Sequence, residues 1–416
     1  MNVLVVGGGG REHAICRALK KSPRVSKLYC APGNGGIAEI AQCVDIRATD
    51  IENMVLFARE NADFVMVAPD DPLALGMVDA LESAGIRAFG PRQNAARLES
   101  SKIYAKGIMK KYGVPTADYM TFTNAGEAKE YIRAHGAPIV VKADGLALGK
   151  GVTVAQDVDA AIKAVDEMML DGKFGESGSS IIIEEYMTGP EITILVFTDG
   201  KTVVPMLSSQ DYKRAFTGNN GPNTGGMGAF CPSPVYTDDI AGVCMKTIIR
   251  PTIDAMKSEG APFKGVLYFG LMLTPDGLRV VEYNARFGDP ETQPILAMLK
   301  TELLDIFEAV ADERLHELCI EWHSGSACCV VMASGGYPAD YKTGYTITGL
   351  DEVPDDVIVF HAGTARSGDA FLTKGGRVLG VTAAAADLEQ AAARAYEGVK
   401  CIDFKDAFYR TDIGRL

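Results

Sequence analysis

Three polar side chains recur at every second position of one short stretch of the chain. In VEYNARFGDPETQ, residues 281–293, they are Glu282, Asn284 and Arg286. Alternate residues of a strand share one face, so the carboxylate, the amide and the guanidinium are expected side by side. A carboxylate beside an amide oxygen is a ligand set for Mg²⁺, which keeps some waters and bridges to substrate phosphates. Arg286 would then brace a transferring phosphoryl group.

An ordinary surface ion pair between Glu282 and Arg286 is the alternative for this stretch. Such i, i+4 pairs are common on edge strands and carry no chemistry. The aromatic Phe287 and the rigid GDPE turn that follow it favour the metal and phosphoryl site.

A lysine and a glycine-rich loop follow the apolar strand PIVVKAD. Lys142 stands at the end of that strand, where a lysine avoids burial unless an anion accompanies it. Gly145, Gly149 and Gly151 leave the next loop mobile, with Lys150 at its tip. A fixed lysine and a flap with a second lysine suit a polyphosphate, which needs cations and enclosure. The spacing is not that of a Walker A motif, and a plain basic turn would leave Lys142 unexplained.

A third candidate lies where the apolar strand of IIIEEYMTGPEIT ends in acidic residues. Glu184 and Glu185 end the strand, Met187 follows, and Glu191 comes after a Gly-Pro turn. Backbone groups at such a crossover can bond to an adenine edge, and Glu191 can accept from ribose hydroxyls. The alternative is a solvated acidic hinge between two domains.

Two further segments carry polar groups among glycines. SSQDYKRAFTGNNGPNTGGMGAF predicts a long loop, which in a compact domain is usually functional. Asp211 could hold an ammonium group, and Lys213 with Arg214 could contact phosphate. At the N-terminus, VLVVGGGGREHA leads a strand into a helix, a place where backbone N–H groups can bind phosphate. The G-x-G-x-x-G spacing is missing, so a tight strand-to-helix turn is an equal alternative, and Arg11 tips the balance towards phosphate.

The elements that position these residues fall into three parts. Residues 1–100 alternate short apolar strands with helical patterns, which predicts βαβ units and a parallel sheet. Residues 101–325 hold a small inserted α+β unit at about 117–190, followed by longer strands. Residues 326–416 have β-rich patterning and end in a helix. The predicted fold class is therefore α/β and α+β multidomain.

Length, charge and composition exclude several classes of protein. A chain of 416 residues with 47% hydrophobic and 23% charged residues is typical of a globular protein with two to four structural units. The net charge of −13 argues against general binding to nucleic acid or to an anionic membrane. No apolar stretch is long enough to span a membrane, and the N-terminus has no signal-peptide pattern. The sequence predicts a cytoplasmic protein.

Together these segments resemble the ATP-grasp enzymes, in which two α+β subdomains clamp ATP. More narrowly, KADGLALGKGV, QDYKR, GPNTGGMGAF and RFGDPETQ are similar to motifs of the phosphoribosylamine-glycine ligase family. The likeness extends over almost the whole chain, to the final YRTDIG. It implies an N-terminal parallel βαβ domain, an ATP-grasp core with a mobile lid subdomain, and a β-rich C-terminal domain.

The resemblance also implies a reaction. ATP, glycine and 5-phospho-β-D-ribosylamine (phosphoribosylamine) would give ADP, phosphate and glycinamide ribonucleotide through a glycyl phosphate, the second step of de novo purine synthesis. ATP would be the cosubstrate, and Mg²⁺ or Mn²⁺ the metal. The partners would be these small molecules, with no nucleic acid and no membrane, and the chain would be a monomer or a weak dimer.

The same resemblance assigns residue roles. Arg286 would stabilise the transferring phosphoryl group, Asp211 would orient glycine, and Lys213 would complete the catalytic set. Glu282 and Asn284 would hold the metal. The remaining assigned residues share a role in binding ATP or the ribosylamine phosphate: Lys102 and Lys142 at the ATP phosphates, Glu185 and Met187 at adenine through their backbone, Glu191 at ribose, and Gly8, Gly9 and Gly10 at the ribosylamine phosphate. Lys150 and Glu184 are further candidates for ATP binding.

Three other functions compete with this interpretation. The nearest is another ATP-grasp ligase or carboxylase of a purine intermediate, which would share the ATP residues and differ in the acceptor loops. A nicotinamide-dependent dehydrogenase built on the first domain lacks the fingerprint spacing. A nucleotide sensor without catalysis would not need Arg286.

Overall fold

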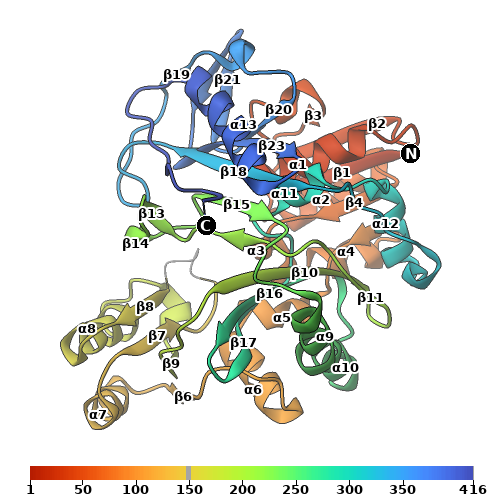
Figure 1. Cartoon of the computed structure of the whole chain (residues 1–416). Helices are drawn as coiled ribbons and strands as arrows, with labels where there is room; N and C mark the ends of the chain where they lie inside the picture. The colour runs from red at the N-terminus through yellow and green to blue at the C-terminus, as the bar shows by residue number, and fades with distance from the viewer. Residues whose placement is uncertain (147–150, 416) are drawn as a thin grey trace.

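The structure is a computed structural model that describes residues 1–146 and 151–415. Figure 1 shows the N-terminal region in red and orange and the C-terminal region in blue, side by side above a central antiparallel sheet. A smaller unit in orange and yellow lies at the other side of that sheet. The predicted mixed α/β and α+β class is confirmed.

Five parallel strands form the N-terminal sheet, in the order β3-β2-β1-β4-β5. The chain leaves the central strand β1 for β2 on one side and later reaches β4 on the other side. The loops after β1 and β4 therefore open towards one crevice, which is where such sheets bind ligands. The strands are β1 (Asn2–Gly7), β2 (Lys27–Pro32), β3 (Gln42–Cys43), β4 (Phe64–Val67) and β5 (Arg87–Phe89).

Helices pack on both faces of this sheet, as the apolar patterns predict. The helical pattern of residues 72–85 is divided between two short helices, because Gly76 adopts φ +86° and separates them. Glycine reaches this left-handed conformation without the steric cost that other residues pay. The helices of residues 1–112 are α1 (Gly10–Lys20), α2 (Ile51–Asn61), α3 (Asp70–Ala74), α4 (Met77–Ser83), α5 (Gln93–Ser100) and α6 (Lys102–Tyr112), the last of which packs against α5.

The smaller unit has its own antiparallel sheet and its own core. The strand order is β6-β9-β7-β8, and α7 (Ala125–His135) and α8 (Val158–Met169) pack against the sheet. Ile132, Val141 and Val165 are completely buried in this core. We refer to this unit, residues 117–190, as the lid. Its strands are β6 (Tyr119–Phe122), β7 (Ile139–Ala143), β8 (Val152–Ala155) and β9 (Ile181–Glu185).

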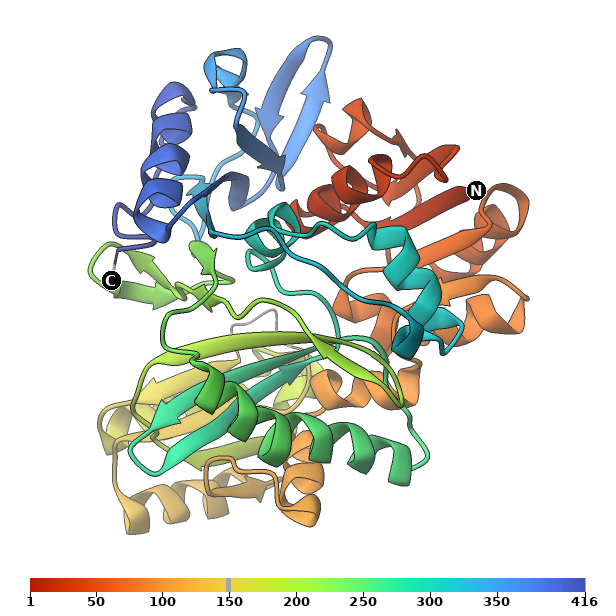
Figure 2. The ribbon, with the colours of Figure 1, turned by 45° about the vertical axis from the view of Figure 1, so that its right-hand side comes forward.

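The central sheet is antiparallel and has the strand order β11-β10-β16-β17. Its two middle strands, β10 and β16, pair along the whole length of β10. Figure 2 shows a line of green helices running along one side of this sheet. They are α9 (Asp238–Cys244), a π-helical turn (Met245–Ile249) and α10 (Arg250–Ser258). The strands are β10 (Glu191–Asp199), β11 (Val203–Pro205), β16 (Lys264–Thr274) and β17 (Gly277–Asn284).

The segment predicted as a long loop, residues 208–230, is mostly short strands, so this prediction is wrong. β13 and β14 form a hairpin, and the flanking strands β12 and β15 pair with each other. Glycines and asparagines hid this arrangement, because they serve turns and bulges as readily as loops. The strands are β12 (Gln210–Asp211), β13 (Arg214–Phe216), β14 (Asn220–Asn223) and β15 (Gly228–Cys231).

β12 and β15 extend the sheet of the C-terminal region, whose order is β12-β15-β18-β23-β20. Part of the segment of residues 208–230 and the C-terminal region therefore share one continuous sheet. Two helices, α11 (Thr292–Ala297) and α12 (Leu303–Ala311), connect the central sheet to this region. The region contains β18 (Ser326–Ala333), β19 (Thr346–Ile347), β20 (Val357–His361), β21 (Thr364–Ser367), β22 (Ala370–Thr373), β23 (Arg377–Ala385) and α13 (Leu388–Cys401).

The N-terminal and C-terminal regions touch directly. The Asn34 side chain donates to the carbonyl oxygens of Gly8 and His361, at 3.0 and 2.8 Å. Among the described residues, no helix combines the length and the apolar character needed to cross a lipid bilayer.

Candidate active site

Glu282 and Asn284 lie at the end of β17, and Arg286 follows two residues later. The register with β16 shifts between the partners of Val280 and Glu282, so Val281 is the extra residue of a bulge. The bulge ends just before the polar face and leaves its alternation intact. The structure therefore brings the three predicted side chains together.

Arg286 is fixed by several contacts. Its Nη2 lies 2.8 Å from Glu99 Oε1 and donates to Asn284 Oδ1 at 3.2 Å. Its Nη1 donates to the carbonyl oxygen of Phe287 at 3.2 Å. The other Glu99 oxygen, Oε2, accepts the backbone N–H of Ala285 at 2.7 Å. The Nε atom of Arg286 is buried and has no hydrogen-bond partner among the described residues.

Glu282 stands among positive charges. Burial would raise the pKa of this carboxyl, but the charges of Lys213, Lys142 and Lys102, with a smaller effect from Arg286, outweigh it and hold the pKa below its usual value. Glu282 is therefore an anion before any metal arrives. Within residues 1–146 and 151–415, no three His, Cys, Asp or Glu side chains form a metal-binding group. A metal here would have Glu282 and the Asn284 amide oxygen as its protein ligands.

Lys142 is buried, with only 5% of its surface exposed, and it has the anionic partner that its position requires. Its Nζ lies 2.9 Å from Glu184 Oε2 and donates to the Val281 carbonyl at 3.3 Å. Lys106 approaches the other Glu184 oxygen at 3.3 Å. Two lysines thus share one carboxylate at the junction between the lid and α6.

Lys102 begins α6 and donates to the Gly145 carbonyl at 2.8 Å. Burial lowers its pKa, and nearby Glu282 opposes that shift. Asp144 accepts from the backbone N–H of Ile103 at 3.0 Å, which ties the start of α6 to the lid. Lys150, predicted at the tip of the glycine flap, lies outside the described residues.

The predicted adenine segment leaves β9 and crosses to β10. Glu185 is exposed, and its backbone N–H already donates to the Asp118 carbonyl at 3.0 Å. Its side chain lies 2.5 Å from Arg279. Met187 follows in irregular backbone, and Glu191 begins β10. A backbone contact of Glu185 to adenine would therefore have to use its carbonyl group.

Asp211 and Lys213 face a narrow space beside Glu282. Lys213 Nζ lies 2.8 Å from Asp211 Oδ2, and burial of the lysine is outweighed by Asp211, which raises the pKa of Lys213. The space has a volume of about 20 Å³ and is lined by Glu191, Asp211, Lys213, Tyr268 and Glu282, among others. That volume suits roughly one water molecule.

Glu291 is a buried carboxyl that sequence reasoning did not single out. Burial and Asp211 raise the pKa of Glu291 to about 7. Perturbed carboxyls of this kind concentrate at functional sites. Its position in the GDPETQ turn, directly after the polar face of β17, is the signal that could have identified it.

The glycine turn after β1 has its own anion. The backbone N–H of Gly9 donates to Glu12 Oε2 at 2.6 Å, so one of the amides expected to bind phosphate is already used. Arg11 does not point to an open phosphate site: it lies 2.7 Å from Glu12 and donates to the Phe287 carbonyl at 3.0 Å. Glu12 and the Phe287 carbonyl thus hold the guanidinium of Arg11, and a phosphate at the glycine turn would have to share it with them. Gly10 lies against the side chain of Gln293.

Arg377 of β23 is a second residue that the sequence did not reveal. It donates to the carbonyl oxygens of Gly225, Gly226 and Asp289, the last at 2.7 Å. Asp289 also lies against the glycine turn. A C-terminal arginine thus connects the GPNTGGMG segment with the GDPE turn, a contact between parts of the chain too distant in sequence for spacing rules to detect.

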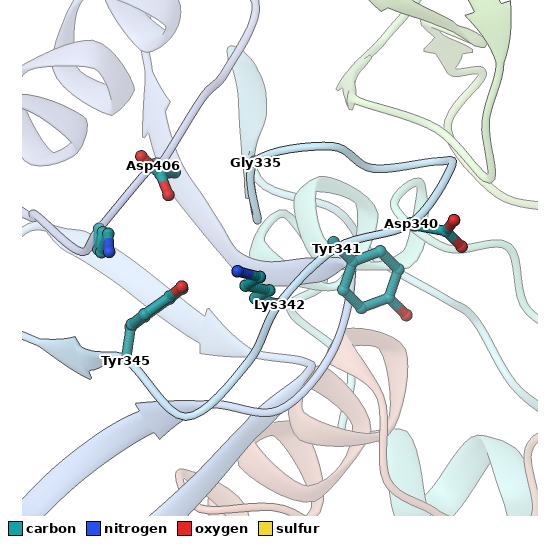
Figure 3. Close-up of a pocket in the computed structure, with 7 residues that line it drawn as sticks. Gly335, Asp340, Tyr341, Lys342, Tyr345 and Asp406 are labelled. Carbon is teal, nitrogen blue, oxygen red and sulfur yellow. The ribbon is translucent and has the colours of Figure 1, made fainter.

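A larger hollow of about 280 Å³ lies elsewhere, in the C-terminal region. Figure 3 shows Lys342 and Tyr345 pointing towards its centre and Tyr341 pointing away. Two lysines and two aspartates balance in charge there, and no predicted site residue contributes. The lining is Gly335, Asp340, Tyr341, Lys342, Tyr345, Lys405 and Asp406.

Comparison with known proteins decides the family. Models of phosphoribosylglycinamide synthetase match the N domain at residues 1–99, the ATP-grasp (A) domain at 100–292 and the C domain at 327–416. The chain belongs to the phosphoribosylglycinamide synthetase family. The resemblance seen in the sequence motifs is therefore confirmed.

Relatives in this family match over their full lengths. A phosphoribosylamine–glycine ligase of Halalkalibacterium halodurans is 48% identical over 415 residues, which are 100% of this chain and 96% of the relative. The ligase of Brucella melitensis is also 48% identical, covering 100% of this chain and 97% of the relative.

Solved structures agree. The crystal structure of phosphoribosylamine–glycine ligase from Thermotoga maritima has a TM-score of 0.84 and 31% identity, covering 99% of this chain and 100% of that one. The biotin carboxylase domain of Hydrogenobacter thermophilus 2-oxoglutarate carboxylase, solved with MgADP and bicarbonate, has a TM-score of 0.77 at 17% identity and covers 98% of this chain and 91% of that one. At that identity the likeness concerns the fold alone.

Proposed function

We propose that this chain joins glycine to phosphoribosylamine with ATP, giving glycinamide ribonucleotide, ADP and phosphate. The observation that carries the proposal is the position of Glu282, Asn284 and Arg286 beside the lysines at 102, 142 and 213, in a chain of this family. Such a collection of cations around one oxygen ligand set suits phosphoryl transfer, which depends on positioning and charge neutralisation. Joining of glycine to phosphoribosylamine is the reaction that the name of the relatives, phosphoribosylamine–glycine ligase, describes.

A carboxylate resists attack by an amine, so activation must come first. ATP would phosphorylate glycine, and the ribosylamine nitrogen would displace phosphate from the resulting glycyl phosphate. Lys102 and Lys142 would hold the ATP phosphates, and Arg286 would offset charge on the transferring phosphoryl group. The proposed ATP-binding set is completed by Lys150, Glu184, Glu185, Met187 and Glu191.

The Glu282 and Asn284 oxygens fit a small hard cation, Mg²⁺ or Mn²⁺. When bound, such a cation supplies Lewis-acid neutralisation of phosphate charge. The protein prepares for it because Glu282 is already ionised and the Asn284 amide is oriented by its bond to Arg286. Two protein ligands suit Mg²⁺ in particular, since it usually retains several waters.

Asp211 is the proposed partner of the glycine ammonium group. In the structure Lys213 Nζ is 2.8 Å from its carboxylate. When the glycine ammonium group replaces the Lys213 ammonium group beside Asp211, the charge balance is preserved and Lys213 moves towards the reacting oxygens. Gly8, Gly9 and Gly10 are the proposed phosphate contacts of the ribosylamine, where a phosphate would compete with Glu12 for the Gly9 amide.

The test measures ADP release in a coupled spectrophotometric assay. Phosphoribosylamine is formed in situ from ribose 5-phosphate and ammonia. Release should need ATP, glycine and the ribosylamine together, and mass spectrometry should detect glycinamide ribonucleotide. Replacement of glycine by alanine or bicarbonate should abolish turnover. If glycine gives no stimulation, or if calorimetry shows preference for NAD over Mg-ATP, the proposal is wrong.

A variant separates the glycine site from the ATP site. Asp211→Asn should raise the KM for glycine about tenfold or more and leave the KM for ATP within about twofold, because it removes the carboxylate proposed for the glycine ammonium group and leaves Lys102 and Lys142 in place. Asp239→Asn, an acidic residue in the first turn of α9, serves as the matched control and should change neither value. Equal effects on both substrates would argue against this role of Asp211.

A further inference from the structure

Glu99 is the buried carboxylate closest to the proposed phosphoryl-transfer residue. It belongs to α5, is 8% exposed, and lies three residues before Lys102. One of its oxygens is 2.8 Å from Arg286 Nη2, and the other accepts the Ala285 N–H at 2.7 Å. Both oxygens thus contact two consecutive residues just beyond the metal-ligand strand.

These two contacts restrain different degrees of freedom. The Ala285 bond fixes the backbone where β17 ends, and the Arg286 contact fixes the rotation of the guanidinium about its side chain. Arg286 is then turned towards Asn284, with its Nε left without a partner among the described residues. An arginine so placed needs little rearrangement before it meets a phosphoryl oxygen.

We propose that Glu99 is a positioning residue for phosphoryl transfer, which acts by holding Arg286 against the Glu282–Asn284 ligand pair. This inference rests on the proposed function, because it assigns Arg286 to the transferring phosphoryl group. Within residues 1–146 and 151–415, no hydrogen bond or ion pair joins Glu99 to Glu282, Asn284 or Lys102, although its charge also acts on the Lys102 ammonium group. The direct effect of Glu99 therefore passes through Arg286.

The dependence is mutual. Burial raises the pKa of Glu99 to about 7, and Arg286 opposes that rise. Glu99 is also the charge that offsets the burial of Arg286, which is only partly exposed. A buried ion pair that loses one member leaves an uncompensated charge, so each residue keeps the other in its working state.

A role in folding alone would have other consequences. If Glu99 served folding alone, its replacement would lower the free energy of unfolding and would not lower kcat selectively at unchanged KM values. The contact between Glu82 and Arg92, at 2.6 Å and more exposed, offers a matched ion pair from the same region. Glu82→Gln, like Glu99→Gln, replaces a carboxylate by an amide, and it should leave turnover unchanged.

The experiment measures kcat, the KM for ATP and the KM for glycine in Glu99→Gln, Glu99→Asp and the Glu82→Gln control. Glu99→Gln keeps an oxygen that can accept the Ala285 N–H, but it removes the negative charge that faces the Arg286 guanidinium. It should lower kcat about a hundredfold, the usual effect of losing an oriented transition-state stabiliser, and leave both KM values within about threefold. Glu99→Asp keeps the charge and should recover part of the rate.

A double-mutant cycle decides whether Glu99 acts through Arg286. Each protein is also scanned by thermal unfolding, so that rates are compared only between folded variants. If Glu99 works through Arg286, Glu99→Gln should cost less than about threefold in an Arg286→Gln background, because the pair acts as a unit. Independent, multiplying losses would overturn the proposal.

Failure of the inference and failure of the proposed function give different results. A wild-type chain that releases no ADP with glycine and ribosylamine contradicts the function itself. A wild-type chain that turns over normally, with Glu99→Gln equally active or with a raised KM and unchanged kcat, contradicts only the role of Glu99.

Discussion

Arg11 and Arg286 donate to the same oxygen, the carbonyl of Phe287, at 3.0 and 3.2 Å. Arg11 comes from the first helix of the N-terminal region and Arg286 from the end of the central sheet. Two guanidinium groups can approach one carbonyl because each has its own carboxylate, Glu12 for Arg11 and Glu99 for Arg286. The backbone after β17 is therefore fixed from two regions at once.

Arg11→Met tests this connection. The change removes a charge-assisted hydrogen bond to Phe287 and leaves Glu12, which is 2% exposed, without its cation. Loss of one member of a buried ion pair costs about 3 kcal/mol or more of unfolding free energy. Urea unfolding measures the change, with Arg17→Met on the exposed face of the same helix as control. A loss below about 1 kcal/mol would mean that the two regions are held together by other contacts.

Glu282→Gln tests the metal site. The amide is a poorer ligand than the ionised carboxylate, so ADP formation at about 1 mM Mg²⁺ should fall about a hundredfold and recover in part at higher Mg²⁺. Chelation of divalent ions should abolish turnover of the unaltered chain. Asp276→Asn lies in the turn before the same strand, with an exposed side chain, and should behave as the unaltered chain. Unchanged Mg²⁺ dependence in Glu282→Gln would place the metal elsewhere.

The chemistry-bearing strand could be predicted because its signal is local. Alternation alone put Glu282 and Asn284 on one face, and a bulge at Val281 fell where it did not disturb that face. The parallel N-terminal sheet followed from strand and helix patterns for the same reason. Segments of this kind carry their information within about ten residues.

The remaining contacts join residues that are far apart in the chain. Arg377 reaches Asp289, and Glu99 reaches Arg286, across distances in sequence that no spacing rule covers. Glycine-rich composition misled in the segment around Asp211, because glycine serves the turns and bulges of short strands as well as loops. Spacing also did not indicate that Arg11 pairs with Glu12, its own neighbour in sequence.

Lys142→Met tests the proposed phosphate contact. Glu184 would keep Lys106 as its partner, so the fold should survive while the charge near the ATP phosphates is lost. The KM for ATP should rise about tenfold to a hundredfold, since charge-assisted contacts are worth about 1.5–3 kcal/mol. Lys110→Met, an exposed residue of α6, is the control. An unchanged KM for ATP together with an unchanged melting temperature would remove Lys142 from the ATP site.

His13 and His361 make the contact between the N-terminal and C-terminal regions sensitive to acid. The Nδ1 atom of His13 accepts the backbone N–H of His361 at 2.8 Å, and both side chains are buried. Burial, with the nearby His361, lowers the pKa of His13 to about 3, and burial lowers that of His361 to about 4. Both rings are thus neutral in the folded chain, whereas unfolded histidine titrates near 6.5.

The sign of the pH effect follows from these values. Between about pH 6.5 and the folded pKa values the unfolded chain binds more protons, so the free energy of unfolding falls as pH falls through that window. At about pH 5 each histidine should cost about 2 kcal/mol relative to pH 7 and above. His13→Asn keeps an acceptor oxygen near the Nδ1 position and cannot titrate, so it should remove about half of the acid sensitivity. Urea unfolding at about pH 7 and about pH 5 measures this, with the exposed His316→Asn as control. If the acid sensitivity of His13→Asn equals that of the unaltered chain, protonation at this contact does not govern acid stability.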